Sequence, residues 1–371
     1  MDHGLCLVSG IYPPDSGGPA KFTFDFEHYA RERVSHLDVV ATTIDKSSKF
    51  HFENGTIFRI TRRSNVLIRY LKFISRLRKL RRKNHFFLVT GAFLEFYFSG
   101  VRKRSQVVYK LPGDIVWERA RNQGLTNLSI EDFQSLALPF KFRLMRKLYT
   151  SSISSADKVI VPSFGLKKLT EQWGIDQSKV YVIFNSVDIE SFQLREQLSK
   201  EFDVLTVCRL TKWKGVEELL RTTHNLGLSL AIVGDGPERV PLEELGLQLK
   251  ARVHFFGDVS FETVRDLYSK SKRFVLNSTY EGLPHVLLEA RASNLLCLAR
   301  EGTGSSEVIH HMKDGILYGG NSGLDLEEAL LLSFSKKIDE DVLKNHALID
   351  LVSRFSQEIN FQRILGLIYE K

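Results

Sequence analysis

The sequence has little cysteine and no long apolar run. Its three cysteines, Cys6, Cys208 and Cys297, are far apart and show no Cys-x-x-Cys spacing, which excludes a disulfide framework and a zinc site. The most apolar stretch, 86–99, is interrupted by Glu95 and is shorter than the roughly 20 residues that a membrane-spanning helix needs. We therefore expect a protein of a reducing compartment with no membrane-spanning segment.

The composition excludes disorder and a pure coiled coil. Hydrophobic residues make up 43% of the 371 residues and charged residues 26%, proportions that are ordinary for a globular protein. This length is enough for roughly two to three domains. The opening Met-Asp-His-Gly lacks the basic segment with which a signal peptide begins. We expect a cytoplasmic protein.

The positive charge is concentrated in one segment. The net charge is +8, but ten lysines and arginines and no acidic residue lie in 62–83, so the remainder of the chain carries −2. This distribution favours one basic surface over a general polyanion-binding protein. We expect no nucleic-acid partner, because aromatic residues are not interleaved with the basic ones as a stacking platform requires.

Short apolar runs bounded by breakers predict strands that alternate with helices. The predicted strands are 4–9, 37–42, 56–60, 86–89, 107–111, 158–162, 180–184, 204–208, 228–233, 253–256, 273–276 and 295–298. The clearest helices are 20–34, 164–173, 216–225, 261–269 and 284–293. This alternation predicts two α/β domains in tandem, each with a parallel sheet. Such a pair places a ligand crevice at the carboxyl ends of the strands, between the halves.

Two carboxylates, Glu281 and Glu289, lie across a predicted strand-to-helix junction. Pro284 suits the first turn of that helix, which puts Glu281 just before the helix and Glu289 inside it. The free N–H groups of the first turn can hold phosphate. Carboxylates beside an anion need another partner, and sugar hydroxyls suit them. The alternative is a glutamate that only favours the helix dipole.

A second polar loop, 208–215, follows a predicted strand and presents Arg209, Lys212 and Lys214 before Gly215. Arginine can bind a phosphate with two parallel hydrogen bonds, and lysine acts on it as a point charge. A solvated basic loop is the alternative. The position of the loop at the expected crevice favours a phosphate site.

Two glycine-rich turns also follow strands. The turn 234–237 is a weak dinucleotide fingerprint, because Arg239 occupies the third glycine position. Gly17 and Gly18, which follow the first strand, can bring the backbone close to a diphosphate. An ordinary turn is the alternative for both.

These pieces in this order resemble the family 4 (group 1) glycosyltransferases of the GT-B fold, and the resemblance covers nearly the whole chain. The matching segments are 17–18, 112–118, 161–163, 182–188, 209–215, 234–237, 256–257, the Glu-x7-Glu of 281–289 and a closing helix at 355–369. The resemblance implies an acceptor-side Rossmann-like domain at 1–187 and a nucleotide-sugar-binding one at 188–353. It also implies a C-terminal helix, 354–371, that returns to the first domain.

The resemblance implies roles for individual residues. Arg209 and Lys214 would neutralise the donor diphosphate and stabilise it as a leaving group. Glu281 would contact hydroxyls of the transferred sugar, and Glu289 the ribose. Asp114 is a candidate for orienting or deprotonating the acceptor.

Backbone groups complete the implied donor site. They come from Gly17 and Gly18 in the first domain and from Gly282 and Leu283 in the second. Members of this kind retain the anomeric configuration and need no bound metal or other cofactor. Asn294 departs from the pattern, since the family commonly has Gly there. The one Asp-x-Asp, 339–341, is interpreted as solvated surface.

The basic segment contains a predicted amphipathic helix at 65–80. One of its faces carries Leu67, Tyr70, Leu71, Ile74 and Leu77, and its other face carries Arg69, Lys72, Arg76, Lys79 and Lys83. A basic amphipathic helix can lie on an anionic membrane. The alternative is that the apolar face packs on the protein's own sheet and the charges stay in water.

The resemblance therefore implies a retaining hexosyltransferase that moves a sugar from a nucleotide-diphosphate-sugar to a hydroxyl of a glycan. We hypothesise a lipid-linked saccharide acceptor in cell-surface polysaccharide biosynthesis, reached from the cytosolic face of the membrane through 62–83. Two alternatives stay open. One is a nucleotide-sugar epimerase of the same fold, and the other is an inert basic protein that binds membranes or polyanions.

Overall fold

The structure is a computed structural model that describes residues 4–15, 17–193 and 199–370. Contacts between Cα atoms divide the chain into two compact units. The N-terminal unit comprises 1–183 and 361–371, and the C-terminal unit comprises 184–360. The sequence-based divisions, at 187 and 353, fall a few residues from these two points.

The N-terminal unit contains an eight-stranded sheet in the order β3-β4-β2-β1-β5-β6-β7-β8. Its strands are β1 (Gly4–Ser9), β2 (Leu37–Thr43), β3 (Ser48–Phe52), β4 (Gly55–Thr61), β5 (Asn84–Val89), β6 (Gln106–Lys110), β7 (Lys158–Val161) and β8 (Val180–Val182). All neighbours pair in parallel except β3 with β4. The sequence prediction missed β3, because this edge strand is largely exposed and has no buried run.

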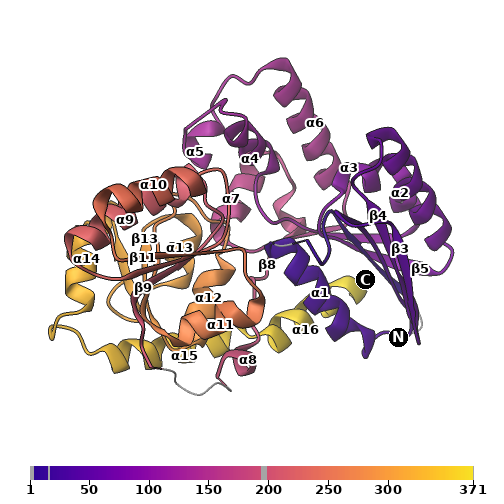
Figure 1. Cartoon of the computed structure of the whole chain (residues 1–371). Coiled ribbons are helices and arrows are strands. Elements are labelled where there is room, and N and C mark those ends of the chain that lie inside the picture. The colour runs from indigo at the N-terminus through magenta and orange to yellow at the C-terminus, as the bar shows by residue number, and fades with distance from the viewer. Residues whose placement is uncertain (1–3, 16, 194–198, 371) are drawn as a thin grey trace. The chain divides into compact units, whose positions relative to one another are not determined.

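Helices cover both faces of this sheet (Figure 1). They are α1 (Gly18–Arg31), α2 (Val66–Leu80), α3 (Phe93–Ser99), α4 (Ile115–Asn122), α5 (Ile130–Phe133), α6 (Phe140–Ser154) and α7 (Phe164–Gln172). On one face Phe22 and Phe26 of α1 pack edge-on against Phe361 of α16 (Gln357–Tyr369). On the other face Phe96 of α3 packs against Phe87 of β5.

Helix α2 packs differently from the sequence prediction. Its buried residues are Phe73, Leu77 and Leu80, whereas Leu67 is 74% and Leu71 is 68% exposed. Only Leu77 of the expected apolar face is buried, so the interpretation that this face packs on the protein's own sheet is wrong for Leu67 and Leu71. The buried stripe starts one turn later because α2 contacts β2, β4 and α3, and the first turns of the helix carry their apolar side chains on the surface.

The C-terminal unit contains a six-stranded parallel sheet in the order β11-β10-β9-β12-β13-β14. Its strands are β9 (Phe202–Val207), β10 (Leu230–Val233), β11 (Val253–Gly257), β12 (Ser271–Leu276), β13 (Leu296–Arg300) and β14 (Ile316–Tyr318). Its helices are α8 (Ile189–Gln193), α9 (Val216–Asn225), α10 (Arg239–Leu249), α11 (Phe261–Ser269), α12 (His285–Ala292), α13 (Thr303–Val308), α14 (Leu326–Ser333) and α15 (Glu340–Phe355).

Alternate side chains of each strand enter two separate cores. Leu205 and Phe274 face α11, α12 and α15, whereas Val204 and Val275 face α9, α10 and α14. Figure 1 shows these two groups of helices on opposite sides of the sheet. Burial on both faces explains why these strands read as continuous apolar runs in the sequence.

Candidate functional site

The order of the strands in the C-terminal unit creates a switch point between β9 and β12. These two strands are parallel neighbours, but the chain leaves β9 toward α9 on one face and leaves β12 toward α12 on the other. The connections after the two strands therefore diverge at their carboxyl ends, the place where open α/β sheets bind ligands. The connections are 208–215 and 277–284, the two polar segments that the sequence analysis selected.

The switch point brings Lys214 and Glu281 together. Lys214 ends the 3-10 turn η3 (Lys212–Lys214) after β9, and Glu281 follows β12. The Lys214 ammonium donates a hydrogen bond to the Glu281 carboxylate, and the side chains are only 16% and 14% exposed. The two connections are also joined by the Thr279 N–H, which donates to the Trp213 carbonyl at 2.9 Å. Two site residues that are 67 positions apart in the sequence therefore form one ion pair.

Asn277 holds the turn that carries Lys214. This side chain is 1% exposed, and its amide donates to the Gly215 carbonyl at 2.7 Å. Its amide oxygen accepts from Tyr318 at 2.8 Å and from Arg300 at 2.9 Å. Gly215 has φ +63°, and a Cβ there would lie 2.5 Å from the Asn277 carbonyl oxygen. Sequence reasoning missed Asn277, whose only signal is an amide at the end of an apolar strand.

Arg209 lies on the same connection as Lys214 with an exposed side chain, and it forms no ion pair with any residue the structure describes. Burial raises the pKa of the preceding thiol, Cys208, to about 11. The weak 234–237 fingerprint has a packing role here. A Cβ on Gly234 would lie 2.0 Å from the Cys208 carbonyl oxygen, and one on Gly236 would lie 2.3 Å from that of Leu210.

Glu289 lies inside α12, as expected, with 7% of the residue exposed. Its carboxylate accepts a hydrogen bond from Tyr268 at 3.3 Å. Pro284 precedes the helix as its N-cap instead of occupying the first turn. The segment before it is held in place by hydrogen bonds to its carbonyl groups, one from a backbone N–H and one from a side-chain amide. Gly304 N–H donates to the Glu281 carbonyl at 3.0 Å, and Asn185 donates to the Leu283 carbonyl at 3.0 Å. Gly282, between them, is partly exposed.

Asp114 has a structural position in the N-terminal unit. It is the N-cap of α4 and 2% exposed, and one carboxylate oxygen accepts from the N–H groups of Val116 and Trp117. The other oxygen accepts from Arg146 at 2.9 Å and from Gln134 at 3.1 Å. With four donors the carboxylate has no capacity left for an acceptor hydroxyl, so this geometry gives the predicted catalytic role of Asp114 no support.

Gly17 and Gly18 lie where the first connection of the N-terminal unit meets α1. Gly17 has φ +120° and precedes the helix, which begins at Gly18. The loop before them is fixed by Asp15, which accepts from the Ile44 N–H at 3.0 Å and pairs with Arg62 at 2.5 Å. Arg62 of the basic segment therefore tethers this loop, a contact across 47 positions.

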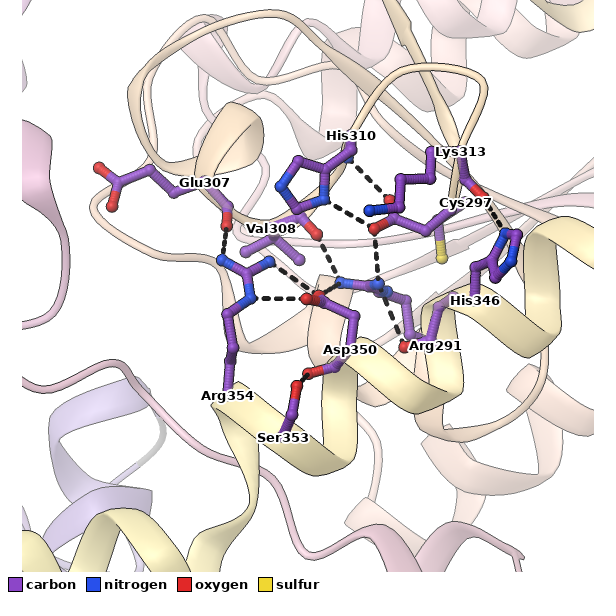
Figure 2. A network of polar contacts seen from close by, with 12 residues as sticks. Arg291, Cys297, Glu307, Val308, His310, Lys313, His346, Asp350, Ser353 and Arg354 are labelled. Atoms are coloured by element: carbon purple, nitrogen blue, oxygen red, sulfur yellow. Dashed lines mark hydrogen bonds and ion pairs between the residues drawn. The ribbon is translucent and has the colours of Figure 1, made fainter.

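A buried polar network behind α12 fixes the helix that carries Glu289 (Figure 2). Its centre is Arg291, whose side chain is fully buried and pairs with Asp350 at 3.2 Å and Asp314 at 3.4 Å. It also donates to the carbonyls of Val308 and Ala347, at 2.5 and 3.2 Å. Sequence reasoning missed this network, since its members are 17 to 59 positions from Arg291.

The same network contains three groups with the spacing of metal ligands. His310, Asp314 and Asp350 offer ligand atoms within 4.8 Å of one another. Asp350 accepts two hydrogen bonds from Arg354, at 2.6 and 2.8 Å, and both carboxylates pair with Arg291. Two guanidinium groups therefore occupy the place that a cation would take.

The 339–341 segment, interpreted from the sequence as solvated surface, also forms an ion pair with the protein interior, since Glu340 pairs with buried Arg273 at 2.7 Å.

The family models match the two halves of the chain separately. Residues 188–347 match the model described as "Glycosyl transferases group 1", and residues 16–191 match the one described as "Glycosyltransferase Family 4".

None of the described helices has the length and apolar character that crossing a bilayer requires.

The matched relatives are glycosyltransferases. Two are uncharacterized proteins of Methanocaldococcus jannaschii. One is 30% identical over 45% of this chain and 48% of its own length, and the other is 22% identical over 88% of both. The O-antigen chain mannosyltransferase of Salmonella typhimurium is 27% identical over 53% of this chain and 56% of its own length.

A solved structure confirms the fold that the sequence predicts. The Anabaena protein HepE, solved in complex with UDP and glucose, matches with a TM-score of 0.75 over 98% of both chains. The two sequences are 18% identical, so this likeness shows the architecture of two parallel-sheet domains and nothing more.

Proposed function

The chain belongs to the group 1 glycosyltransferases with the GT-B fold, and from that premise we propose that it transfers a sugar from a nucleotide-diphosphate-sugar to a glycan hydroxyl with retention of configuration. The Lys214–Glu281 pair at the switch point of β9 and β12 carries the proposal. It offers a cation for the diphosphate and a carboxylate for sugar hydroxyls at one place. The bound UDP and glucose of HepE, a protein of the same fold, give further support.

In this proposal the donor exchanges partners with the ion pair. The diphosphate takes Lys214 from Glu281, and the freed carboxylate accepts hydrogen bonds from the sugar. Exposed Arg209 contributes a second cation. As the glycosidic bond breaks, negative charge grows on the departing diphosphate. Two fixed cations therefore stabilise the transition state more than the ground state. The proposed reaction uses no resident metal.

A thermal shift with UDP, GDP and ADP tests the donor site. A nucleotide at about 100 times its dissociation constant stabilises its protein by about 2.7 kcal/mol. We expect one of the three to raise the melting temperature of the wild type, and Arg209→Ala to lose most of that shift. Incubation with the matching nucleotide-sugar alone separates transfer from epimerisation, since an epimerase converts the donor without an acceptor. If no nucleotide shifts the wild type, the donor proposal fails.

We further propose that the acceptor is a lipid-linked glycan of a cell-surface polysaccharide, reached at the cytosolic face of the membrane. The exposed side of α2 supports this. Four apolar residues lie on the surface of its first turns, namely Val66 (56% exposed), Leu67 (74%), Ile68 (50%) and Leu71 (68%). They adjoin the ten cations of 62–83, and apolar residues combined with cations favour an anionic membrane surface.

Flotation with vesicles tests the membrane proposal. We expect recovery on phosphatidylglycerol vesicles to exceed that on neutral phosphatidylcholine vesicles. We expect Leu67→Ser/Leu71→Ser to reduce recovery on phosphatidylglycerol vesicles at least tenfold, because the variant no longer buries two leucine side chains in the lipid. Val342 on α15 is 47% exposed and distant in sequence, so Val342→Ser serves as the control. Equal recovery of the wild type on both kinds of vesicle would contradict the proposal.

A further inference from the structure

A cavity of about 650 Å³ lies between α2 and the β3–β4 hairpin of the N-terminal unit. Its lining combines Ser47, which precedes the hairpin, residues 48–49 of the first strand, 58–60 of the second, and Leu71, Lys72, Ser75, Arg76 and Lys79 of α2. No aspartate or glutamate is among them. A volume of this size is typical of small-molecule sites, and nothing in the proposed transfer reaction uses it.

The cations of this cavity have no counter-charge. Lys49 and Arg76 pack over the same ring, Phe58, at 5.6 and 4.1 Å from its centroid. Lys72 and Lys79 lie on the α2 side of the lining. Within 4–15, 17–193 and 199–370, none of these four cations forms an ion pair. Arg59, a fifth cation of the lining, packs over Tyr12 and Phe50.

The ring of Phe58 lies beside two of these positive charges. Phe58 is 7% exposed, and the two cations approach it from different elements, the β3 edge strand and α2. Like charges beside one ring repel each other, and an anion with more than one negative oxygen relieves that repulsion. Ser48 and Ser75 add hydroxyl donors to the lining. The chemistry therefore fits a phosphomonoester or a diphosphate.

The apolar residues beside the cavity indicate what carries the phosphate. Leu71 is itself part of the lining, and Leu67 precedes it by one helical turn, so both leucines lie at the rim. A soluble phosphate would leave them in water, whereas the chain of a lipid would cover them. We propose that this cavity binds the terminal phosphate or diphosphate of a lipid headgroup, an inference that rests on the proposed membrane association and adds headgroup selectivity to it.

Flotation on two kinds of anionic vesicle of equal surface potential tests the inference. Phosphatidic acid presents a phosphomonoester and phosphatidylglycerol only a diester. We expect the wild type to bind phosphatidic acid vesicles about tenfold more tightly, and Lys72→Ala/Arg76→Ala to bring this ratio close to one. Lys49→Ser should lower the ratio as well, from the other element of the cavity. Each cation near an anionic surface contributes about fivefold to partitioning, so the double variant also binds both vesicles more weakly.

Arg82→Ala/Lys83→Ala is the matched control, because it removes the same charge from the same basic segment outside the cavity lining. It should weaken binding to both vesicles equally and leave the ratio unchanged. An unchanged nucleotide-induced thermal shift in every variant shows that the protein is folded.

Equal binding of the wild type to both vesicles would overturn the headgroup site and leave the membrane proposal standing. No binding to either would overturn both. Inorganic pyrophosphate distinguishes the source of the phosphate. If it protects the wild type from unfolding in a Lys72- and Arg76-dependent way while vesicles show no preference, the cavity serves a soluble anion and the lipid assignment is wrong.

Discussion

Lys214→Ala is expected to lower kcat/KM by about 10²- to 10³-fold, the usual effect of removing one fixed group that stabilises developing negative charge. Two losses combine in this variant. The departing diphosphate loses a cation, and the Glu281 carboxylate, whose side chain is 14% exposed, loses the Lys214 ammonium and then repels the phosphates. Steady-state kinetics with the nucleotide-sugar that the thermal shift identifies measures the loss.

Lys212→Ala is the matched control, since Lys212 lies in the same 3-10 turn with an exposed side chain. We expect its kcat/KM to stay within about threefold of the wild type. The double variant Lys214→Ala/Glu281→Gln separates the two losses. It should recover part of the nucleotide affinity lost in Lys214→Ala, because the carboxylate that repels the phosphates is gone. It should recover none of the activity, because the effects of two groups in one network are not additive. A loss below tenfold in Lys214→Ala would remove this residue from the catalytic machinery.

The sequence was sufficient to predict the elements that local signals define. Helices α9 and α11 begin and end where they were expected, at 216–225 and 261–269. Gly215, with φ +63°, precedes the first, and the Ser260 side chain caps the second by accepting from Thr263. Asn294, where the family commonly has Gly, has φ +59°, a left-handed conformation in which Asn is among the best-tolerated residues.

The site was predictable only in part. Arg209, Lys214 and Glu281 follow buried strands, and the topology brings such strand ends together, so their types and spacing were informative. Asn277 was not, because its significance depends on Gly215, Arg300 and Tyr318, which are 62, 23 and 41 positions away. The same limit explains why the sequence left open which residues of α2 pack on the sheet. Helical periodicity gives a face for each residue but does not tell which face meets the sheet.

Arg291→Met is expected to lower the free energy of unfolding by about 3–5 kcal/mol at pH 7, the typical result of removing one partner from a buried ion network. The arginine side chain is fully buried, and its two partners, Asp314 and Asp350, are 1% and 18% exposed. Without the guanidinium, two carboxylates remain in a protein interior with too little compensation. Urea denaturation of the full chain, followed by circular dichroism, measures the loss.

Arg354→Met is the matched control, because Arg354 pairs with the same Asp350 but is 28% exposed. Its loss should stay near 1 kcal/mol, as for pairs close to the surface.

The pH dependence supplies an independent check on Arg291. Although burial raises it, the pKa of Asp350 lies below its usual range, because Arg354 donates hydrogen bonds to the carboxylate and Arg291 adds its charge. A carboxyl group with a lowered folded-state pKa stabilises the protein above its unfolded pKa of about 3.8, and this contribution is lost as the pH falls through the folded pKa. In Arg291→Met the Asp350 carboxylate keeps its hydrogen bonds from Arg354 but loses the charge of Arg291, so its pKa rises and it is protonated at a higher pH than in the wild type. We therefore expect the difference in stability between the wild type and the variant to shrink as the pH falls from the raised Asp350 pKa of the variant to the lowered one of the wild type, which lies below 3.8. A constant difference over this range would mean that the loss comes from packing and not from charge.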